Sequence, residues 1–205
     1  MTTLTSKRDL SEDTELEVKI DTQTFHKFLD VGMLKEDDRV ELIEGRMYEM
    51  TPIGLRHMAL VKRLGMFFSK QAGDKFIVGI QDGIRLSEYI EVYPDITILK
   101  FKDDFYVKGY PDPENDILLI IEVADKSLKY DRDRKLPLYA GAKVLEVWIV
   151  NLQEGVVEVY QYPDSKKKEY TLIRRVSGGE IKPLKLEDIT LLLTQIAQIL
   201  KPNNV

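Results

Sequence analysis

The sequence predicts an α/β protein whose central mixed β-sheet is flanked by helices. Residues 55–72 repeat apolar side chains every three or four positions, which is typical of an amphipathic helix. Residues 117–122 and 145–152 are short apolar runs of the kind that form buried strands. Residues 156–162 and 169–175 alternate apolar and polar side chains, which favours antiparallel strands at one side of the same sheet. Because helical and strand-like segments alternate along the chain, a layered α/β fold is the simplest arrangement that buries the apolar side chains of both.

Local signals place the remaining elements along the chain. Residues 1–15 are polar and charge-dense, which predicts a mobile tail before a single domain over residues 16–205. Gly73 is a fitting end for the first long helix, and Pro137 predicts a short first turn or a kink in a helix over residues 131–142. The other expected elements are a helix over residues 22–29 capped by Asp21 or Thr22, two short strands around Glu44 within residues 39–50, strands over residues 75–81 and 83–86, and an amphipathic closing helix over residues 191–200.

The composition restricts the chemistry that is available. The chain has 205 residues, of which 43% are hydrophobic and 32% charged, as is ordinary for a globular domain. The absence of cysteine excludes disulfides, thiolate zinc sites and cysteine nucleophiles. His26 and His57 are the only histidines, so a histidine-rich metal site is excluded as well. A catalytic metal would therefore be held mainly by oxygen ligands, which favours Mg²⁺, Mn²⁺ or Ca²⁺.

Charge and hydropathy bear on location and partners. No apolar stretch reaches the roughly 18 residues of a membrane span. The N-terminus lacks the apolar core of a secretory signal, so we expect a cytoplasmic protein. The net charge of −5 argues against a generally basic nucleic-acid-binding surface. Residues 126–135 and 164–175 each carry five basic and two acidic side chains, and each segment is either a solvated face or a local basic patch.

Two carboxylates mark the ends of apolar runs. Asp95 opens the run DITILK after Pro94, and Glu122 closes the run ILLIIE. Burying such a charge without a partner costs several kcal/mol. Carboxylates displayed from neighbouring strands form a site for a hard divalent cation, and the lysine-bearing residues 126–135 follow. Together these groups suit metal-assisted hydrolysis of a phosphodiester, whereas the alternative is a pair of strand ends with solvent-facing acids.

The helix expected over residues 131–142 carries Asp131, Lys135 and Tyr139 at four-residue spacing, roughly along one face. One interpretation is a surface ion pair between Asp131 and Lys135, which is worth a few tenths of a kcal/mol. In the other, Lys135 points back at Glu122, where it orients an attacking water or stabilises charge on a phosphate. Tyr139 is expected to pack against the sheet with its hydroxyl satisfied.

Four more polar residues are candidates for accessory roles. His57 falls in the first turn of the long helix, as an N-terminal polar residue or as a ligand or base. Glu41 and Glu44 flank an apolar pair before a glycine turn, and each is either a solvated strand residue or an accessory acid. Gln81 ends a strand ahead of Asp95, where it could contact a substrate.

Several segments also resemble those of a known family. They are RVELIEGRMYEM, the TP…H pattern at residues 51–57, YPDITIL, and residues 120–151, which are the most specific. Through them the chain is similar, over nearly its whole length, to the Uma family of bacterial restriction-endonuclease-like proteins, within the PD-(D/E)XK nuclease superfamily. The resemblance implies a restriction-endonuclease core, with a central mixed sheet and flanking helices. It also implies cleavage of DNA that depends on Mg²⁺, with Mn²⁺ as the alternative ion.

The resemblance assigns the main catalytic roles. Asp95 matches the family's metal-binding aspartate, and Glu122 matches its second acid. The superfamily usually has its lysine two residues after that acid, where this chain has Ala124. Within the family the lysine resembles one moved to the following helix, which here is Lys135, with Lys126 as the rival.

The resemblance also bears on the accessory residues. Glu41, rather than Glu44, matches the acid of the family's E-L-I-x-G signature, and His57 matches a family position. Three functions stay open: a metal-dependent endonuclease, a catalytically silent nuclease fold that binds DNA or protein, and an unrelated carboxylate-metal hydrolase of small phosphoesters. Because cleavage of both DNA strands favours a twofold arrangement, residues 145–152 and 169–175 are candidates for a homodimer interface.

Overall fold

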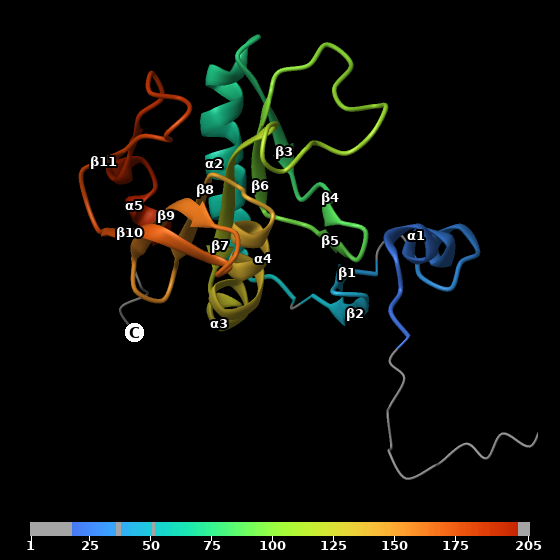
Figure 1. Ribbon diagram of the computed structural model, residues 1–205. Helices are drawn as coiled ribbons and strands as arrows, with labels where there is room; N and C mark the ends of the chain where they lie inside the picture. The colour runs from blue at the N-terminus through green and yellow to red at the C-terminus, as the bar shows by residue number, and fades with distance from the viewer. Residues whose placement is uncertain (1–17, 36–37, 51, 201–205) are drawn as a thin grey trace, which may run out of the picture.

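The computed structural model describes residues 18–35, 38–50 and 52–200, and a six-stranded mixed sheet forms its centre (Figure 1). The strands follow the order β10-β9-β8-β7-β6-β3. β7 and β8 are parallel, and the other neighbouring pairs are antiparallel. The strands are β3 (Phe76–Ile80), β6 (Ile96–Lys100), β7 (Ile117–Ala124), β8 (Glu146–Asn151), β9 (Val156–Asp164) and β10 (Glu169–Val176).

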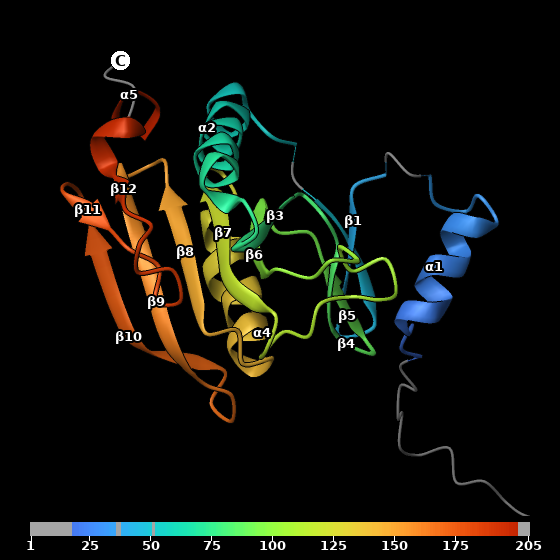
Figure 2. The same ribbon diagram turned by 90° about the horizontal axis from the view of Figure 1, so that it is seen from above.

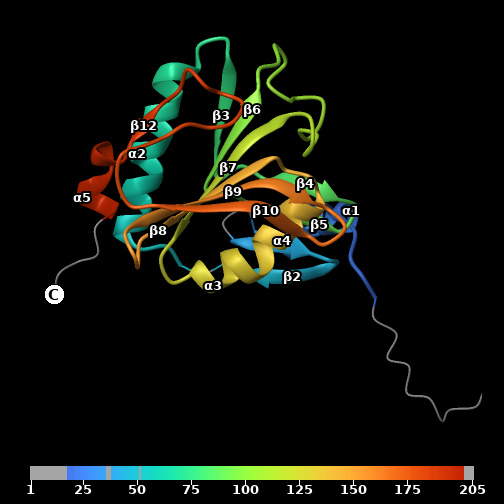
Figure 3. The ribbon, with the colours of Figure 1, turned by 60° about the vertical axis from the view of Figure 1, so that its left-hand side comes forward.

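Helices cover both faces of this sheet. The side chains of β7 alternate between the faces, because Leu119, Ile121 and Val123 join one hydrophobic cluster and Ile120 and Ala124 join the other. The first cluster includes α2 and the C-terminal segment, and the second includes α4. Figure 3 shows α2 and the α3–α4 segment on opposite sides of the strands. These helices are α2 (Leu55–Ala72), α3 (Leu128–Tyr130) and α4 (Leu136–Gly141). The mixed sheet flanked by helices confirms the predicted fold class.

A smaller antiparallel sheet lies beside the central one, with the order β2-β1-β5-β4 (Figure 2). Its β5 leads through Pro94 and Asp95 into β6, so the two sheets are joined at the start of β6. This junction is where the predicted site lies. The remaining elements of this half are α1 (Thr22–Asp30), β1 (Val40–Ile43), β2 (Arg46–Glu49), β4 (Ile84–Ser87) and β5 (Ile90–Val92).

Most of the expected elements are confirmed. The cap of α1 is Asp21 rather than Thr22, because a carboxylate oxygen of Asp21 accepts a hydrogen bond from the backbone N–H of Thr24 at 2.7 Å. The helix α2 ends before Gly73, which has a positive φ of 47°. None of the helices in the described ranges is long and apolar enough to cross a membrane. The tail expected over residues 1–15 lies outside the described residues.

The closing helix expected over residues 191–200 is wrong. Leu191 pairs with Ile181 in a two-stranded sheet of β11 and β12, so a strand replaces the first helical turn. A 3₁₀ turn and one short helix follow. Leu191 and Leu193 are both buried at strand-like spacing, before Ile196 and Leu200 continue at helical spacing. The elements are β11 (Glu180–Ile181), β12 (Leu191–Leu192), η2 (Leu193–Gln195) and α5 (Ala197–Leu200).

One of the two segments expected at a homodimer interface is internal. Residues 145–152 contain β8, which lies between β7 and β9 and whose residues are all buried. This segment therefore has no free edge for a second copy. By contrast, β10 is the last strand of the central sheet, so the hairpin of residues 169–175 keeps an open edge.

Candidate functional site

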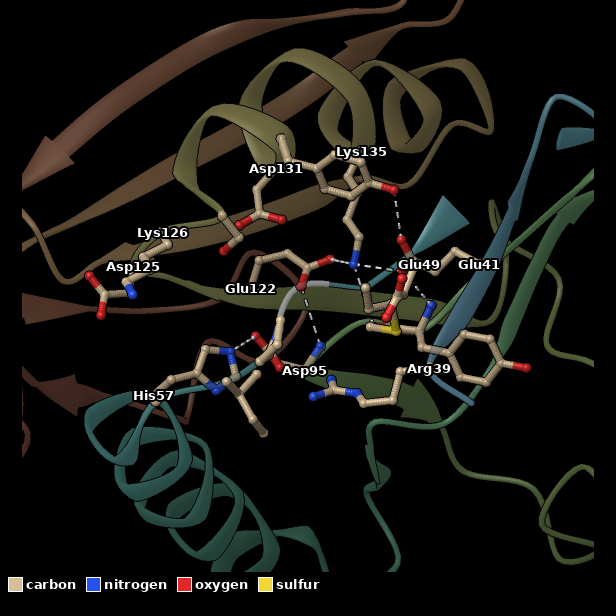
Figure 4. Close-up of a pocket in the computed structure, with 17 residues that line it drawn as sticks. Arg39, Glu41, Glu49, His57, Asp95, Glu122, Asp125, Lys126, Asp131 and Lys135 are labelled. Carbon is tan, nitrogen blue, oxygen red and sulfur yellow. Dashed lines mark hydrogen bonds and ion pairs between the residues drawn. The ribbon is translucent and has the colours of Figure 1, made fainter. Parts of the chain in front are cut away.

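Adjacent strands bring the two predicted carboxylates together. Ile96 of β6 pairs with Ile121 of β7, so Asp95, one residue earlier, lies beside Glu122. The backbone N–H of Asp95 donates to Oε2 of Glu122 at 3.4 Å. Glu122 lies inside its strand rather than at the end, because β7 continues to Ala124. Both acids line a cavity of about 340 Å³ between the two sheets and the helices (Figure 4).

Three elements hold the carboxylate of Asp95. Its Oδ2 accepts a hydrogen bond from the backbone N–H of Val123 at 2.8 Å and lies 2.9 Å from Nε2 of His57, in the first turn of α2. Its Oδ1 accepts from the side-chain amide of Gln81 at 3.3 Å. Gln81 follows β3 with a left-handed φ of 57°, a conformation that is uncommon for residues other than glycine. Asp95 is thus fixed in orientation before any ligand binds.

Glu122 is buried and bonded on its other side to the helix that follows β7. Its Oε1 accepts a hydrogen bond from the hydroxyl of Tyr139 at 2.5 Å and lies 3.2 Å from Nζ of Lys135. Burial raises the pKa of Glu122 to about 8, although Lys135 favours the ionised form. Burial acts to lower the pKa of Lys135, but the carboxylates of Glu122 and Glu41 outweigh it and raise that pKa. Lys135 therefore keeps its charge inside the cluster.

Glu41 joins this cluster from β1 of the smaller sheet. Its Oε1 lies 2.9 Å from Nζ of Lys135 and accepts from the backbone N–H of Tyr93 at 3.0 Å. Its Oε2 accepts from the hydroxyl of Tyr130 at 3.0 Å. Glu44, the alternative acid, lies on the surface and pairs instead with a lysine of the β9–β10 turn. The structure therefore brings Glu41 into the cluster and leaves Glu44 outside it.

A π-helical turn carries Lys135 toward the sheet. The turn is η1 (Asp131–Lys135), which connects α3 to α4, so the helical segment begins at Leu128 rather than at residue 131. Pro137 is the second residue of α4, which directly follows the π-helical turn, so the interruption expected at the proline lies at this turn. Asp131 and Lys135 are both 4% exposed, so the interpretation of a surface ion pair is wrong. Burial raises the pKa of Asp131 to about 6.

The donors in the cavity fit a hard cation that keeps part of its water shell. Asp95 and Glu122 are neighbours in the lining of the cavity, and carboxylate oxygens are ligands that Mg²⁺ prefers. Within the described residues, no group of three or more His, Asp and Glu side chains is arranged to hold a metal ion. Binding through one or two carboxylates, with water as the other ligands, is the usual mode of Mg²⁺. The residues present are thus compatible with Mg²⁺ and do not form an all-protein cage.

Comparison with known proteins identifies the family. A sequence model of Uma2, a family described as "putative restriction endonuclease", matches residues 22–193. The chain belongs to the Uma2 family. The fold of this Uma2 protein is similar to that of a crystal structure from Anabaena variabilis, described as "a putative nuclease belonging to DUF820". The two share 14% sequence identity with a TM-score of 0.67, over 88% of this chain and 99% of that chain. No curated protein matches the Uma2 chain.

The residues predicted from the sequence of this Uma2 protein gather in one place. Six of them line the cavity, and the other two donate hydrogen bonds to its carboxylates. The lining residues are Glu41, His57, Asp95, Glu122, Asp131 and Lys135, and the two donors are Gln81 and Tyr139.

The sequence did not point to Tyr130 or Arg39, which also line the cavity. Tyr130 bonds to Glu41 across 89 positions of the Uma2 sequence, a contact that no local spacing predicts. One feature of the sequence could have indicated a role for Arg39, because it is the first residue of the RVELIEGRMYEM segment that resembles the family.

Proposed function

We propose that this protein is a metal-dependent endodeoxyribonuclease that hydrolyses phosphodiester bonds of DNA. One observation carries the proposal. Asp95, Glu122 and Lys135 come from three segments of the chain and meet in one cavity, in a member of a family described as "putative restriction endonuclease". Two acids that can hold a cation, beside a buried ammonium group, are the groups that phosphodiester hydrolysis needs.

Each residue of the cluster has a separate role in the proposed reaction. Asp95 and Glu122 hold Mg²⁺, or Mn²⁺ in its place, and a bound ion of this kind lowers the pKa of water and neutralises charge on the phosphate. Lys135 orients the attacking water or stabilises the negative charge that develops on the phosphate oxygens. Glu41 keeps Lys135 in place through their 2.9 Å ion pair. His57 fixes the orientation of the Asp95 carboxylate, as residues behind a metal ligand commonly do.

One observation favours a second candidate, a catalytically silent nuclease fold that binds DNA or protein. Glu122 already bonds to Tyr139, Lys135 and the backbone N–H of Asp95. A cation that binds Glu122 must share or displace one of these contacts. A chain in which that exchange fails would keep the fold without the chemistry.

A cleavage assay decides between the two candidates. Supercoiled plasmid and single-stranded DNA are incubated with Mg²⁺, with Mn²⁺ or with EDTA. We expect cleavage that depends on the metal and falls by at least about 100-fold in Asp95→Ala and in Glu122→Gln, with circular dichroism confirming that both variants fold. The matched control is Glu44→Gln, which removes an acid outside the cluster and is expected to cleave normally.

Two results would contradict the proposal. If folded wild type cleaves under no metal, the silent fold is the better description. If cleavage survives in the double variant Asp95→Ala/Glu122→Gln, the nuclease site lies elsewhere in the protein.

We also propose that two copies pair through β10, since cleavage of both DNA strands favours a twofold dimer. β10 is an edge strand of eight residues, and its backbone groups on the outer side are available to a second strand. Leu172 is 39% exposed and Ile173 is 57% exposed on this strand. An antiparallel pairing centred on Leu172 places Glu169 of one copy opposite Arg175 of the other, which is favourable in charge.

A further inference from the structure

The cavity holds more negative charge than positive. Three basic side chains, Arg39, Lys126 and Lys135, line it, and the ammonium group of Lys135 is already occupied by two carboxylates. A nucleic-acid phosphate that approaches this site is repelled unless cations face it. The acidic side chains that line the cavity are Glu41, Glu49, Asp95, Glu122, Asp125 and Asp131.

Arg39 and Lys126 are the cations left to face a ligand. Within the described part of the chain, neither one forms an ion pair. Arg39 is only partly exposed, so its guanidinium is held near the cavity wall rather than free in solvent. A guanidinium in this position presents two parallel N–H groups, the geometry that binds a phosphate in a bidentate manner.

The two cations lie on different sides of the carboxylate pair. Arg39 directly precedes β1 of the smaller sheet, where its carbonyl accepts a hydrogen bond from the N–H of Met50 at 2.7 Å. Its side chain reaches from that side toward Asp95 (Figure 4). Lys126 follows β7 and precedes α3, so it lines the cavity from the helix side. Arg39 and Lys126 therefore line the cavity from two different elements, and Asp95 and Glu122 belong to the same lining.

We infer that Arg39 and Lys126 bind the two phosphates of one DNA strand that flank the reacting phosphate, which lies over Asp95 and Glu122. This inference rests on the proposed nuclease function and adds the path of the substrate strand. The cavity of about 340 Å³ accommodates a segment of one backbone, not a duplex. Arg39 and Lys126 are positioning residues, because they hold phosphates that do not react.

The test measures DNA binding separately from cleavage. Fluorescence anisotropy follows a fluorescein-labelled duplex and its single strand, over a range of salt concentrations, with Ca²⁺ present so that bound DNA is not consumed. We expect Arg39→Ala to weaken binding by about tenfold and Lys126→Ala by about fivefold, and each to lower the salt-dependence slope by about one. Arg39→Lys keeps the positive charge but lacks the two parallel N–H groups of the guanidinium. Compared with Arg39→Ala, it is therefore expected to restore the salt-dependence slope but only part of the affinity for DNA.

A matched control separates this site from a general loss of charge. Lys185 is an exposed lysine in the loop between β11 and β12, and Lys185→Ala is expected to leave both affinity and slope unchanged. In cleavage assays with Mg²⁺, Arg39→Ala is expected to raise KM about tenfold and to change kcat much less, because phosphates bound on either side contribute equally to the ground state and the transition state.

The outcomes distinguish this inference from the proposed function. If wild type binds and cleaves DNA while Arg39→Ala and Lys126→Ala keep its affinity and slope, the strand path is wrong and the nuclease proposal stands. If wild type binds DNA without cleaving it, the salt-dependence slopes of the variants still show whether Arg39 and Lys126 contact the DNA strand. If wild type neither binds nor cleaves DNA, both proposals fail. Thermal melts of Arg39→Ala and Arg39→Lys show whether either change acts through unfolding.

Discussion

Lys135 is the residue on which the site depends most. It is a buried ammonium group between two carboxylates, at 2.9 Å from Glu41 and 3.2 Å from Glu122. Replacing buried ion pairs with apolar residues is often neutral, but removing one partner leaves the others uncompensated. Lys135 therefore has a structural role as well as the proposed catalytic one, and a test has to separate the two.

We predict that Lys135→Met destabilises the fold by about 3–5 kcal/mol, because Glu41 loses its cation in a buried position. It should also remove DNA cleavage, whereas Lys126→Ala lowers it only several-fold through weaker binding. Urea unfolding and initial rates of plasmid nicking measure the two effects. Lys135→Arg, which keeps the charge, serves as the variant that folds. If Lys126→Ala costs more activity than Lys135→Arg and Lys135→Met, the lysine that acts in cleavage is Lys126 rather than Lys135.

At the scale of elements, the helical segment between β7 and β8 connects the site to β9, two strands away on the same face of the sheet. Arg132, on the turn that carries Lys135, donates from Nε to Oε2 of Glu158 on β9 at 2.9 Å, with a second bond from its Nη2 to Oε1. Burial acts to raise the pKa of Glu158, but the hydrogen bonds from Arg132, Asn151 and Tyr160 outweigh it and lower that pKa. This contact holds the turn against the strands.

We predict that Arg132→Ala lowers the free energy of unfolding by about 1.5–3 kcal/mol at neutral pH. Because the folded pKa of Glu158 lies below its ordinary value of 4.5, the stabilisation is fully present above that value and is lost as pH falls through the folded pKa. Urea unfolding at neutral pH and at successively lower pH should therefore show the difference from wild type shrinking. Lys129→Ala removes an exposed partner of Asp133 and should cost at most about 0.5 kcal/mol. A difference that grows in acid would contradict this account.

At the scale of the whole molecule, the strong hydrophobic patterns of the sequence predicted the architecture, whereas the weak pattern near the C-terminus did not. The apolar runs of β7 and β8 and the helical spacing of α2 are dictated by burial, so the sequence carries them directly. The segment after residue 190 is short, and its first residues pair with β11, which precedes it in the sequence, instead of forming a helical turn. Tertiary contacts, rather than the local sequence pattern, therefore determine the secondary structure of that segment.

The candidate site divides in the same way. Asp95 and Glu122 stand out because they are acids at apolar strands, and the pairing of β6 with β7 makes them neighbours. The choice of Lys135 over Lys126 came from the family resemblance rather than from spacing. A π-helical turn of five residues decides where Lys135 points, and no pattern in DRDRK predicts such a turn.

We predict that the protein is a dimer in solution and that Ile173→Lys makes it monomeric. A lysine at position 173, next to the centre of the pairing, places two like charges diagonally across the strands when two copies pair, and edge lysines oppose such pairing. Light scattering during size-exclusion chromatography, over a range of concentrations, measures the mass. Val107→Lys adds the same charge to another exposed apolar position, 82% accessible, and should leave the dimer intact. A monomeric wild type at every concentration would remove the proposal.

The lysine of this site stands on a helix, whereas the acid beside it stands on a strand. Two alternate residues of a strand lie on one face, and the backbone alone holds them about 7 Å apart. Here the spacing between Glu122 and Lys135 is set by how a helical turn rests on a sheet. The geometry of the proposed catalytic site is then no more rigid than that packing. Warming, acid or a distant substitution that lets the turn shift would switch off the chemistry while the strands stay paired, so the protein would lose its activity before it loses its fold.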